Sequence, residues 1–198
     1  MTGKLSIKAG FRAVDEVYSS FEEEVRGFRT GQACKSGCAF CCSHAGSIDV
    51  TTLEGLRIRG LIQKFSRSRQ KSLEKSLFRE VRHREKNLVV PCPFLMKNNV
   101  CMIYEIRPFS CRRIYSLHTC TKENPPRVNR KVMDKGEEEI KRLQEIDSTG
   151  YLGHISYILH MLDAPGFLDT YMGGGFDPGK IVVFGKSHNI VINQKMTL

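Results

Sequence analysis

The residues with the most evident chemical potential are four cysteines that fall within nine consecutive residues. A cysteine that only packs in a core could be replaced by another small apolar side chain, so packing does not require such a cluster. Thiolates bind soft and borderline metals, and close spacing reduces the entropy lost when ligands gather around one ion. We therefore expect a protein organised around a cysteine-ligated metal centre. The clustered cysteines are Cys34, Cys38, Cys41 and Cys42, and four more follow at Cys92, Cys101, Cys111 and Cys120.

The segment that carries the first four cysteines can bring its thiols together in two ways. In a loop, Gly37 permits a tight turn that points two thiols at one metal. In a helix, all four cysteines fall within one stripe of roughly 100°. The adjacent Cys41 and Cys42 diverge where the backbone is extended, so they either bind different metals or include one that is not a ligand.

Length and composition set the domain organisation and the compartment that we expect. The chain has 198 residues, of which 40% are hydrophobic, and this size fits one domain or one domain with an appendage. We predict a cysteine-cluster domain over residues 1–120, a polar connector over 121–135 and a helical extension over 136–198 that packs on the same core. The sequence has no apolar stretch that could span a bilayer and no apolar N-terminal signal, which predicts a cytoplasmic protein without a membrane partner. Cytoplasmic thiols stay reduced, so a metal centre is favoured over disulfide bonds.

Positive charge is concentrated in residues 57–86. This segment has eleven Lys and Arg against three Glu, while the whole chain has a net charge of +10. Such a segment is either a solvated helix face or a binding surface for an acidic protein or a nucleic acid. No aromatic residues alternate with the charges, which disfavours base stacking with a single strand.

Hydrophobic periodicity predicts a mainly α fold with one small β-hairpin. The clearest helix spans residues 11–28, where apolar side chains recur every three or four positions. A helix over 51–64 begins with Thr51 and Glu54 at capping-box spacing, and it is expected to pair with a basic helix over 71–86. Shorter helices are expected at 137–146, 151–162, 167–171 and 181–184.

The hairpin is expected over residues 89–104, where two extended runs flank turn residues. It would present Cys92 and Cys101 near each other. Cys111 follows Pro108, a residue typical of the first position of a helix. At that position the helix dipole and the neighbouring arginines would favour the thiolate form.

The combined pattern resembles the YkgJ-type cysteine-cluster family, which is described as zinc- or iron-chelating domains. The resemblance covers roughly residues 30–115 and rests on Cys34-x3-Cys38-x2-Cys41-Cys42, on Pro91-Cys92-Pro93-Phe94-Leu95 and on Cys101-x-Ile103-Tyr104-Glu105-x-Arg107-Pro108-x-x-Cys111-Arg112. The family signature is often written with two residues between the first two cysteines, where this chain has three. The family includes a flagellin lysine N-methylase associated with an iron–sulfur cluster. The resemblance implies metal binding by Cys34, Cys38, Cys41, Cys42, Cys92, Cys101 and Cys111.

The number of thiols bears on the identity of the metal. Zinc with four thiolates would be a closed structural site, and an iron–sulfur cluster also takes four thiolates. Seven or eight thiols exceed one tetrahedral zinc and fit one cluster with spare thiols or two four-thiolate sites, which favours an iron–sulfur cluster. Zinc remains the alternative. Arg107 and Arg112 would offset the negative charge of the centre, or they would pair with Glu105. Further possible ligands are Cys120, His44 and His118.

Three classes of function remain open at this stage. The leading one is a metal-binding protein whose centre is structural or handles metal or electrons. The second is an enzyme, for instance one that methylates protein lysines with S-adenosylmethionine, and the third is a zinc-stabilised basic module that binds nucleic acid. The first three cysteines also resemble the cluster motif of radical S-adenosylmethionine enzymes, but no strand–helix repeat surrounds them. We identify no catalytic residues, because the sequence has no Ser–His–acid set, P-loop or H-E-x-x-H motif.

Overall fold

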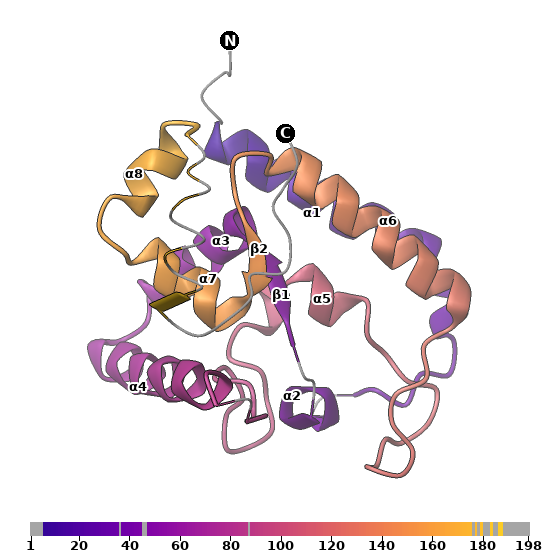
Figure 1. The fold of residues 1–198 in the computed structure, drawn as a ribbon. Coiled ribbons are helices and arrows are strands. Elements are labelled where there is room, and N and C mark those ends of the chain that lie inside the picture. Colours follow the sequence, from indigo (N-terminus) through magenta and orange to yellow (C-terminus); the bar gives the residue numbers. More distant parts are fainter. Residues whose placement is uncertain are drawn as a thin grey trace.

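The structure is a computed structural model that describes residues 6–35, 37–44, 47–86, 88–175, 177, 179, 183, 186 and 187. Over these residues the chain is mainly helical, with one small sheet (Figure 1). Its α-helices are α1 (Ile7–Glu24), α2 (Phe40–His44), α3 (Thr52–Ile62), α4 (Arg67–Arg84), α5 (Phe109–Arg112), α6 (Arg130–Ile146), α7 (Ile155–Leu162) and α8 (Phe167–Met172). The other elements are the 3-10 helices η1 (Arg26–Arg29) and η2 (Tyr104–Ile106) and the strands β1 (Asp49–Thr51) and β2 (Leu152–His154).

The mainly α class with a small antiparallel sheet is confirmed, but the sheet is not where the sequence predicted it. The strands β1 and β2 pair antiparallel, with Asp49 opposite His154 and Thr51 opposite Leu152. The predicted hairpin over 89–104 contains one isolated bridge, between Leu95 and Cys101. The expected helix over 151–162 therefore begins later, as α7, because its first residues form β2.

One of the two hydrophobic clusters lies between α1 and α6, which run side by side in Figure 1. The apolar stripe predicted for the first helix is buried there, since Val17 and Phe21 are fully inaccessible to solvent. The helix begins earlier than expected and ends at Glu24, after which the chain continues as η1. Phe28 is 37% exposed for this reason, although the periodicity placed it on the buried stripe.

The other cluster surrounds α7, which packs against both α3 and α4. The capping box of α3 is confirmed, because the Thr51 side chain accepts the Glu54 N–H and the Glu54 carboxylate accepts the Thr51 N–H. The expected pairing of α3 with α4 is wrong in detail, since each helix packs mainly on α7. Helix α7 is apolar, and its buried side chains, among them Ile158 and Leu162, form the surface on which α3 and α4 pack.

The region that we expected to be a polar connector contains the beginning of α6. The helix begins at Arg130, where the Asn129 side chain accepts the Lys131 N–H, and Val132 is already buried against α1. The short helix predicted around residues 167–171 is confirmed as α8. Of the helix predicted over 181–184, residue 183 alone is described, so the rest of that prediction lies outside the described residues. Among the described helices, none is long and apolar enough to cross a membrane.

Candidate metal centre

The segment from Cys34 to Cys42 combines the two conformations that the sequence left open. Gly37 has φ = 85°, a left-handed value that favours glycine, and it forms a turn in which Cys38 donates its N–H to the Lys35 carbonyl at 2.9 Å. The chain then enters α2, a helix of five residues that carries the last two cysteines. The turn thus precedes Cys38, and the short helix carries Cys41 and Cys42.

The segment around Cys92 lies directly against α2. The backbone N–H of Cys92 donates to the Cys42 carbonyl at 2.7 Å. The chain then turns back, and Met102 donates its N–H to the Phe94 carbonyl at 2.8 Å, which brings Cys101 alongside. Pro91 and Pro93 have no N–H to give to a strand ladder, which explains why a tight turn forms here instead of a regular hairpin. The expected proximity of the two cysteines nevertheless follows from this turn.

Cys111 lies on α5, which is fixed from two sides. The Phe109 N–H, at the first turn of α5, donates to Glu54 Oε1 at 2.9 Å. The Ser110 hydroxyl donates to the Asp49 carbonyl at 2.6 Å. Burial raises the pKa of Cys111 well above its ordinary value, and the charge of Arg107 opposes this only in part. The thiolate-favouring environment that we predicted for Cys111 is therefore outweighed by desolvation.

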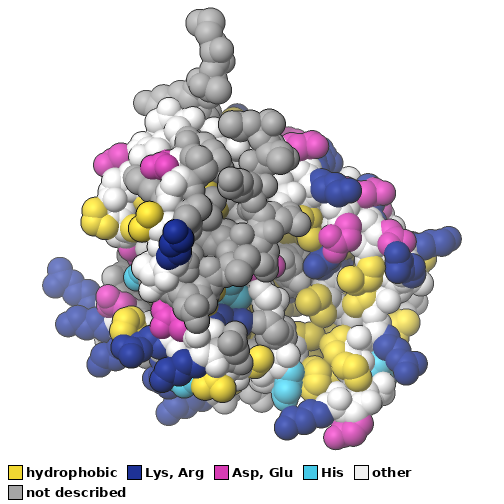
Figure 2. Space-filling view, viewed as in Figure 1, with side chains coloured by type: hydrophobic (Ala, Val, Ile, Leu, Met, Phe, Trp, Pro, Cys, Tyr) yellow, Lys and Arg dark blue, Asp and Glu magenta, His cyan; other side chains and the backbone are white. Residues whose placement is uncertain are grey.

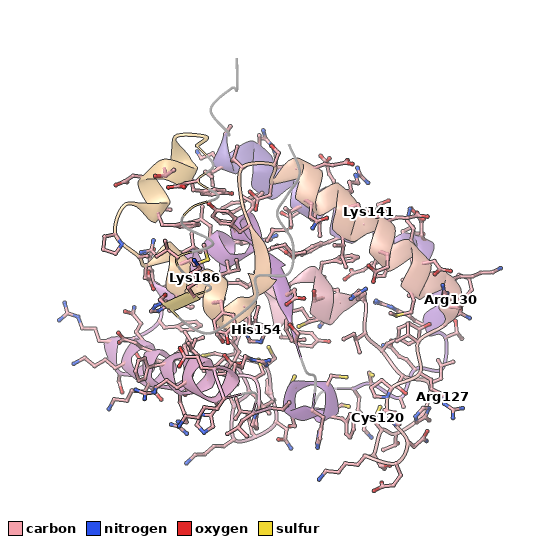
Figure 3. The ribbon with its side chains drawn as sticks, viewed as in Figure 1. Cys120, Arg127, Arg130, Lys141, His154 and Lys186 are labelled. Atoms are coloured by element: carbon pink, nitrogen blue, oxygen red, sulfur yellow. The ribbon has the colours of Figure 1, made fainter. Side chains whose placement is uncertain are left out.

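The eight cysteines are free thiols, and they divide into two sets. We call Cys34, Cys38, Cys41 and Cys120 group A. Burial raises the pKa of Cys41 to about 12, with repulsion from the other three thiolates of the group and from Cys42 adding to it. These sulfurs therefore lie near enough for each thiolate to affect the pKa of Cys41. Figure 3 shows Cys120, from the loop before α6, next to α2.

The remaining cysteines, Cys42, Cys92, Cys101 and Cys111, form group B. Burial raises the pKa of Cys92 to about 12, and the thiolates of Cys42 and Cys101 raise it further. The pKa of Cys111 is affected by all three other members of the group. Cys41 and Cys42, adjacent in sequence, thus belong to different groups. Cys42 also interacts with Cys38, so the two groups are neighbours.

Backbone amides stabilise several of these sulfurs. The Ser116 N–H donates to the Cys34 sulfur at 3.3 Å. The N–H groups of Phe94 and Ile103 lower the pKa values of the cysteines two residues before them, Cys92 and Cys101, although burial dominates both pKa values and raises them. Hydrogen bonds to sulfur favour the thiolate and tune thiolate-ligated iron. The donor set in both groups therefore fits a metal that binds thiolates.

Neither group forms a closed ligand set in this structure. Among the described residues, no three His, Cys, Asp or Glu side chains stand in an arrangement that would hold a metal ion. A metal held by four thiolates of one group would require these sulfurs to approach one another and to lose their protons. A bound cation favours both changes, because it cancels the repulsion among the thiolates.

Of the three charged residues expected around the thiols, Arg107 is the one whose charge reaches them. Arg107 lowers the pKa values of Cys42 and Cys101 against the opposing effect of burial, and its guanidinium lies 4.0 Å from the centre of the Tyr104 ring. The Arg112 guanidinium donates to Glu22 Oε1 at 2.7 Å instead and so connects α5 to α1. Glu105 contributes its backbone carbonyl, which accepts a hydrogen bond from Arg112 at 2.9 Å.

The two candidate histidines lie near group A without a bond to its sulfurs. His44 is exposed at the end of α2, where its Nδ1 is 3.1 Å from the Phe40 carbonyl. The His118 Nε2 is 3.1 Å from the Pro125 carbonyl and fixes the loop that contains Cys120. The sequence offered Cys120 only as a further possible ligand, because it stands outside the spaced motif. Its position in group A depends on a loop whose path no local pattern predicts.

The basic segment over residues 57–86 is partly neutralised within the fold. Arg59 and Arg84 pair with Asp163 and Glu80, and Arg57 pairs with Asp15. The other cations project mainly from α4, and Figure 2 shows Lys and Arg side chains gathered over that helix, on the left. The cations of α4 therefore form a solvated helix face, which is one of the two interpretations that the sequence allowed. Contacts within the described residues do not test binding to an acidic protein or a nucleic acid.

The fold and the site define a class of protein: a mainly helical chain with eight free thiols in two neighbouring groups, a composition typical of proteins that bind metal through cysteines. The chain belongs to the family described as "CxxCxxCC: Putative zinc- or iron-chelating domain", whose model matches residues 33–146. The match extends beyond the segment that carried the resemblance and includes Cys120 and all of α6. No curated protein and no solved structure matches the chain.

Proposed function

We propose that this protein binds metal at two neighbouring four-thiolate sites, one in group A and one in group B. The division of eight cysteines into two sets of four is the observation that supports this proposal. Four thiolates complete the ligand set of zinc or of an iron–sulfur cluster, so two sites use all the thiols. A reducing compartment such as the cytoplasm would keep these thiols available.

An iron–sulfur cluster is the cofactor that we favour over zinc. In two-cluster ferredoxins the last cysteine of a closely spaced run binds the other cluster. The adjacent Cys41 and Cys42 would divide between two centres in the same way. Arg107, beside group B, would offset the negative charge of a cluster with four thiolates. The centres would serve a structural role or the handling of metal or electrons.

Purification without oxygen, followed by elemental analysis, tests the proposal. We expect iron with acid-labile sulfide and absorption near ~400 nm, as thiolate-to-iron bands would give. A colourless protein with about two zinc ions per chain would support the two sites but identify the metal as zinc. A protein that contains neither iron nor zinc, and binds neither when it is reconstituted, would contradict the proposal.

Single substitutions test the ligand assignment. We expect Cys38→Ser and Cys120→Ser each to remove the metal of group A, and Cys111→Ser to remove the metal of group B. Each variant should therefore lose about half of the bound metal. Loss of metal should also reduce solubility, because binding free energy is part of folding free energy. Full metal content in all three variants would show that the assignment is wrong.

A further inference from the structure

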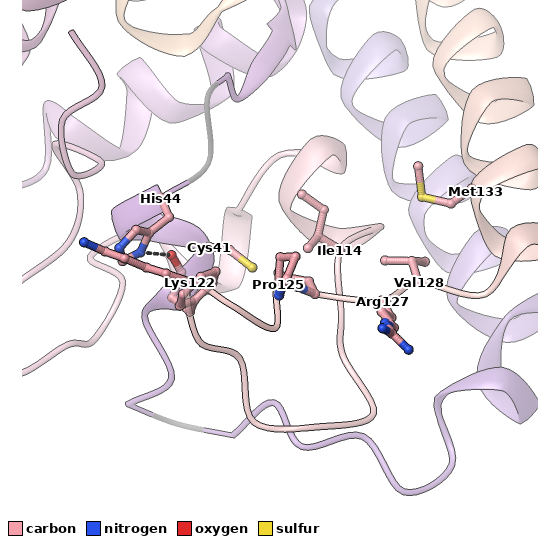
Figure 4. A pocket seen from close by; sticks show the side chains of 10 residues that line it. Cys41, His44, Ile114, Lys122, Pro125, Arg127, Val128 and Met133 are labelled. Carbon is pink, nitrogen blue, oxygen red and sulfur yellow. Dashed lines mark hydrogen bonds between the residues drawn. The ribbon is translucent and has the colours of Figure 1, made fainter.

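A cavity of about 830 Å³ opens beside α2, and the thiol of Cys41 forms part of its wall. Figure 4 shows the Cys41 sulfur turned toward Pro125, with His44 and Lys122 on one side and Val128 and Met133 on the other. This volume falls within the range of small-molecule sites, about 300–1,000 Å³. The cavity therefore combines the size of a ligand site with direct access to group A.

Most of the cavity wall is apolar. Figure 2 shows hydrophobic side chains gathered on this face, at the lower right. The apolar lining comes from α2, from the chain just after α5, and from the loop and first turn that lead into α6, so three separate segments build one surface. These side chains are Phe40, Ile114, Pro125, Pro126, Val128 and Met133.

The remaining lining residues have no negative charge. They are the Cys41 thiol, the imidazole of His44 and the cations of Lys122 and Arg127. Neither cation forms an ion pair with a residue that the structure describes. Two cations without a counter-charge at the edge of an apolar cavity attract an anion.

Both sides of the cavity are held in place. The rings of Phe40 and His44 stack with their centres 4.4 Å apart, which orients the α2 side. On the other side, the His118 ring contacts the carbonyls of Asn124 and Pro125 at 3.3 and 3.1 Å and fixes the loop. The surface is thus formed before any ligand binds, which lowers the entropy cost of binding.

We propose that this cavity binds a small organic anion with an apolar body, such as an aryl-alkyl carboxylate. The carboxylate lies at the Lys122 side of the cavity, the body covers the apolar wall, and Arg127 at the opposite side adds to the positive potential. An inorganic anion would leave the apolar wall in water, and a neutral apolar molecule would leave both cations without a counter-charge. A ligand seated in this way lies over Cys41 and restricts access to group A.

Calorimetry and ligand-observed NMR test the binding with 4-phenylbutyrate as the probe. Its matched control is 4-phenyl-1-butanol, which has the same body without the charge. We expect the carboxylate to bind at least about fivefold more tightly than the alcohol, because exposed ion pairs contribute modestly. Failure of both 4-phenylbutyrate and octanoate to bind at millimolar concentration would overturn the proposal, and so would equal binding of acid and alcohol.

Variants locate the binding site. The double variant Lys122→Gln/Arg127→Gln should weaken binding of 4-phenylbutyrate about fivefold or more. Met133→Trp should fill the apolar end and weaken it about tenfold or more. Lys131→Gln removes a neighbouring exposed cation that does not line the cavity and should leave binding unchanged. Unchanged binding in the double variant and in Met133→Trp would overturn the proposal, even if the probe binds elsewhere.

The effect on group A is the part that depends on the proposed function. In metal-loaded protein, 4-phenylbutyrate should slow the transfer of the more labile metal to a chelator, and it should have no such effect in Met133→Trp. Binding without slower transfer would overturn only the covering of Cys41. Because metal content is measured separately, a chain that binds the probe but no metal would contradict the proposed function and leave the cavity assignment standing.

Discussion

The backbone N–H of Cys92 donates a hydrogen bond to the carbonyl oxygen of Cys42, with nitrogen and oxygen 2.7 Å apart. The bond joins main chain to main chain across fifty residues of sequence, so it does not depend on the rotamer of either thiol. It fixes the segment that carries Cys92 against α2. Two of the four cysteines of group B are therefore held together through the backbone.

The first prediction tests the assignment of Cys41 to group A and of Cys42 to group B. Cys41→Ser should remove the metal of group A and Cys42→Ser the metal of group B, each leaving about half of the total. The metal that remains should differ, because Cys38 of group A is exposed while all four cysteines of group B are partly buried. Chelator transfer should thus be slow in Cys41→Ser and fast in Cys42→Ser. Ser43→Ala, on the same helix, is the control, and identical transfer kinetics in the two cysteine variants would contradict the division.

Gly37→Ala tests the turn between Cys34 and Cys38. With φ = 85°, a side chain at this position is strained by about 1–2 kcal/mol, although a Cβ would meet no atom within 4 Å. We expect the affinity of group A for metal to fall roughly five- to thirtyfold, measured by chelator competition. Gly60→Ala, in open space on α3, should instead stabilise the chain by about 0.5–1 kcal/mol. Unchanged affinity in Gly37→Ala would mean that the turn does not organise the site.

Glu54→Gln tests the buried carboxylate that connects α3 with α1 and α5. Glu54 accepts hydrogen bonds from the Thr51 N–H at 2.8 Å, from the Phe109 N–H at 2.9 Å and from the Tyr18 hydroxyl. In the Gln variant, the NH2 group of the side-chain amide would face one of these N–H or O–H donors, so two donors would be placed against each other. We expect the free energy of unfolding to fall by about 1–3 kcal/mol, or roughly 2–12 °C in Tm. Glu138→Gln, exposed on α6, should stay within about 0.5 kcal/mol of the parent.

Asp147 should give stability a dependence on pH. Burial raises its pKa to about 7, against the Leu53 N–H and the Tyr171 hydroxyl, which donate to the carboxylate at 2.7 and 2.8 Å. The folded chain then holds a proton that the unfolded chain, with a pKa of about 4, has lost. This contribution is complete below about pH 4 and is lost as pH rises to about 7. Urea denaturation between about pH 5 and pH 8 should show parent stability falling relative to Asp147→Asn. A constant difference would contradict the raised pKa.

His154 should act in the opposite direction. Burial and the charge of Arg84 lower its pKa to about 3, so the folded chain keeps the ring neutral. The unfolded chain takes up a proton below about pH 6.5, so stability is lost as pH falls from there toward about 3. His154→Asn retains an acceptor for the Ser156 N–H at the start of α7 and should remove this slope. Chemical denaturation between about pH 7 and pH 5 checks it, and parallel curves for parent and variant would refute it.

Short sequence patterns predicted the elements that depend on interactions between residues close in sequence. The stripe of α1 and the capping box of α3 depend on side chains three and four residues apart, and both are present. The sheet could not be predicted in the same way, because each strand has three residues and the partners, β1 and β2, are about a hundred residues apart. The start of α6 was assigned to a polar connector, because the residues before the buried Val132 are polar and show no apolar periodicity.

The sequence by itself determined that thiols are numerous, that helices dominate, and that the pattern belongs to a metal-chelating family. Only the tertiary structure decided which distant thiols are neighbours: it placed Cys120 near Cys34 and Cys41, and Cys111 near Cys42, Cys92 and Cys101. The physical reason is that convergence of distant side chains depends on how loops return to the core. Those returns are fixed by long-range contacts such as those of Glu54 and Cys92, which no short stretch of sequence contains.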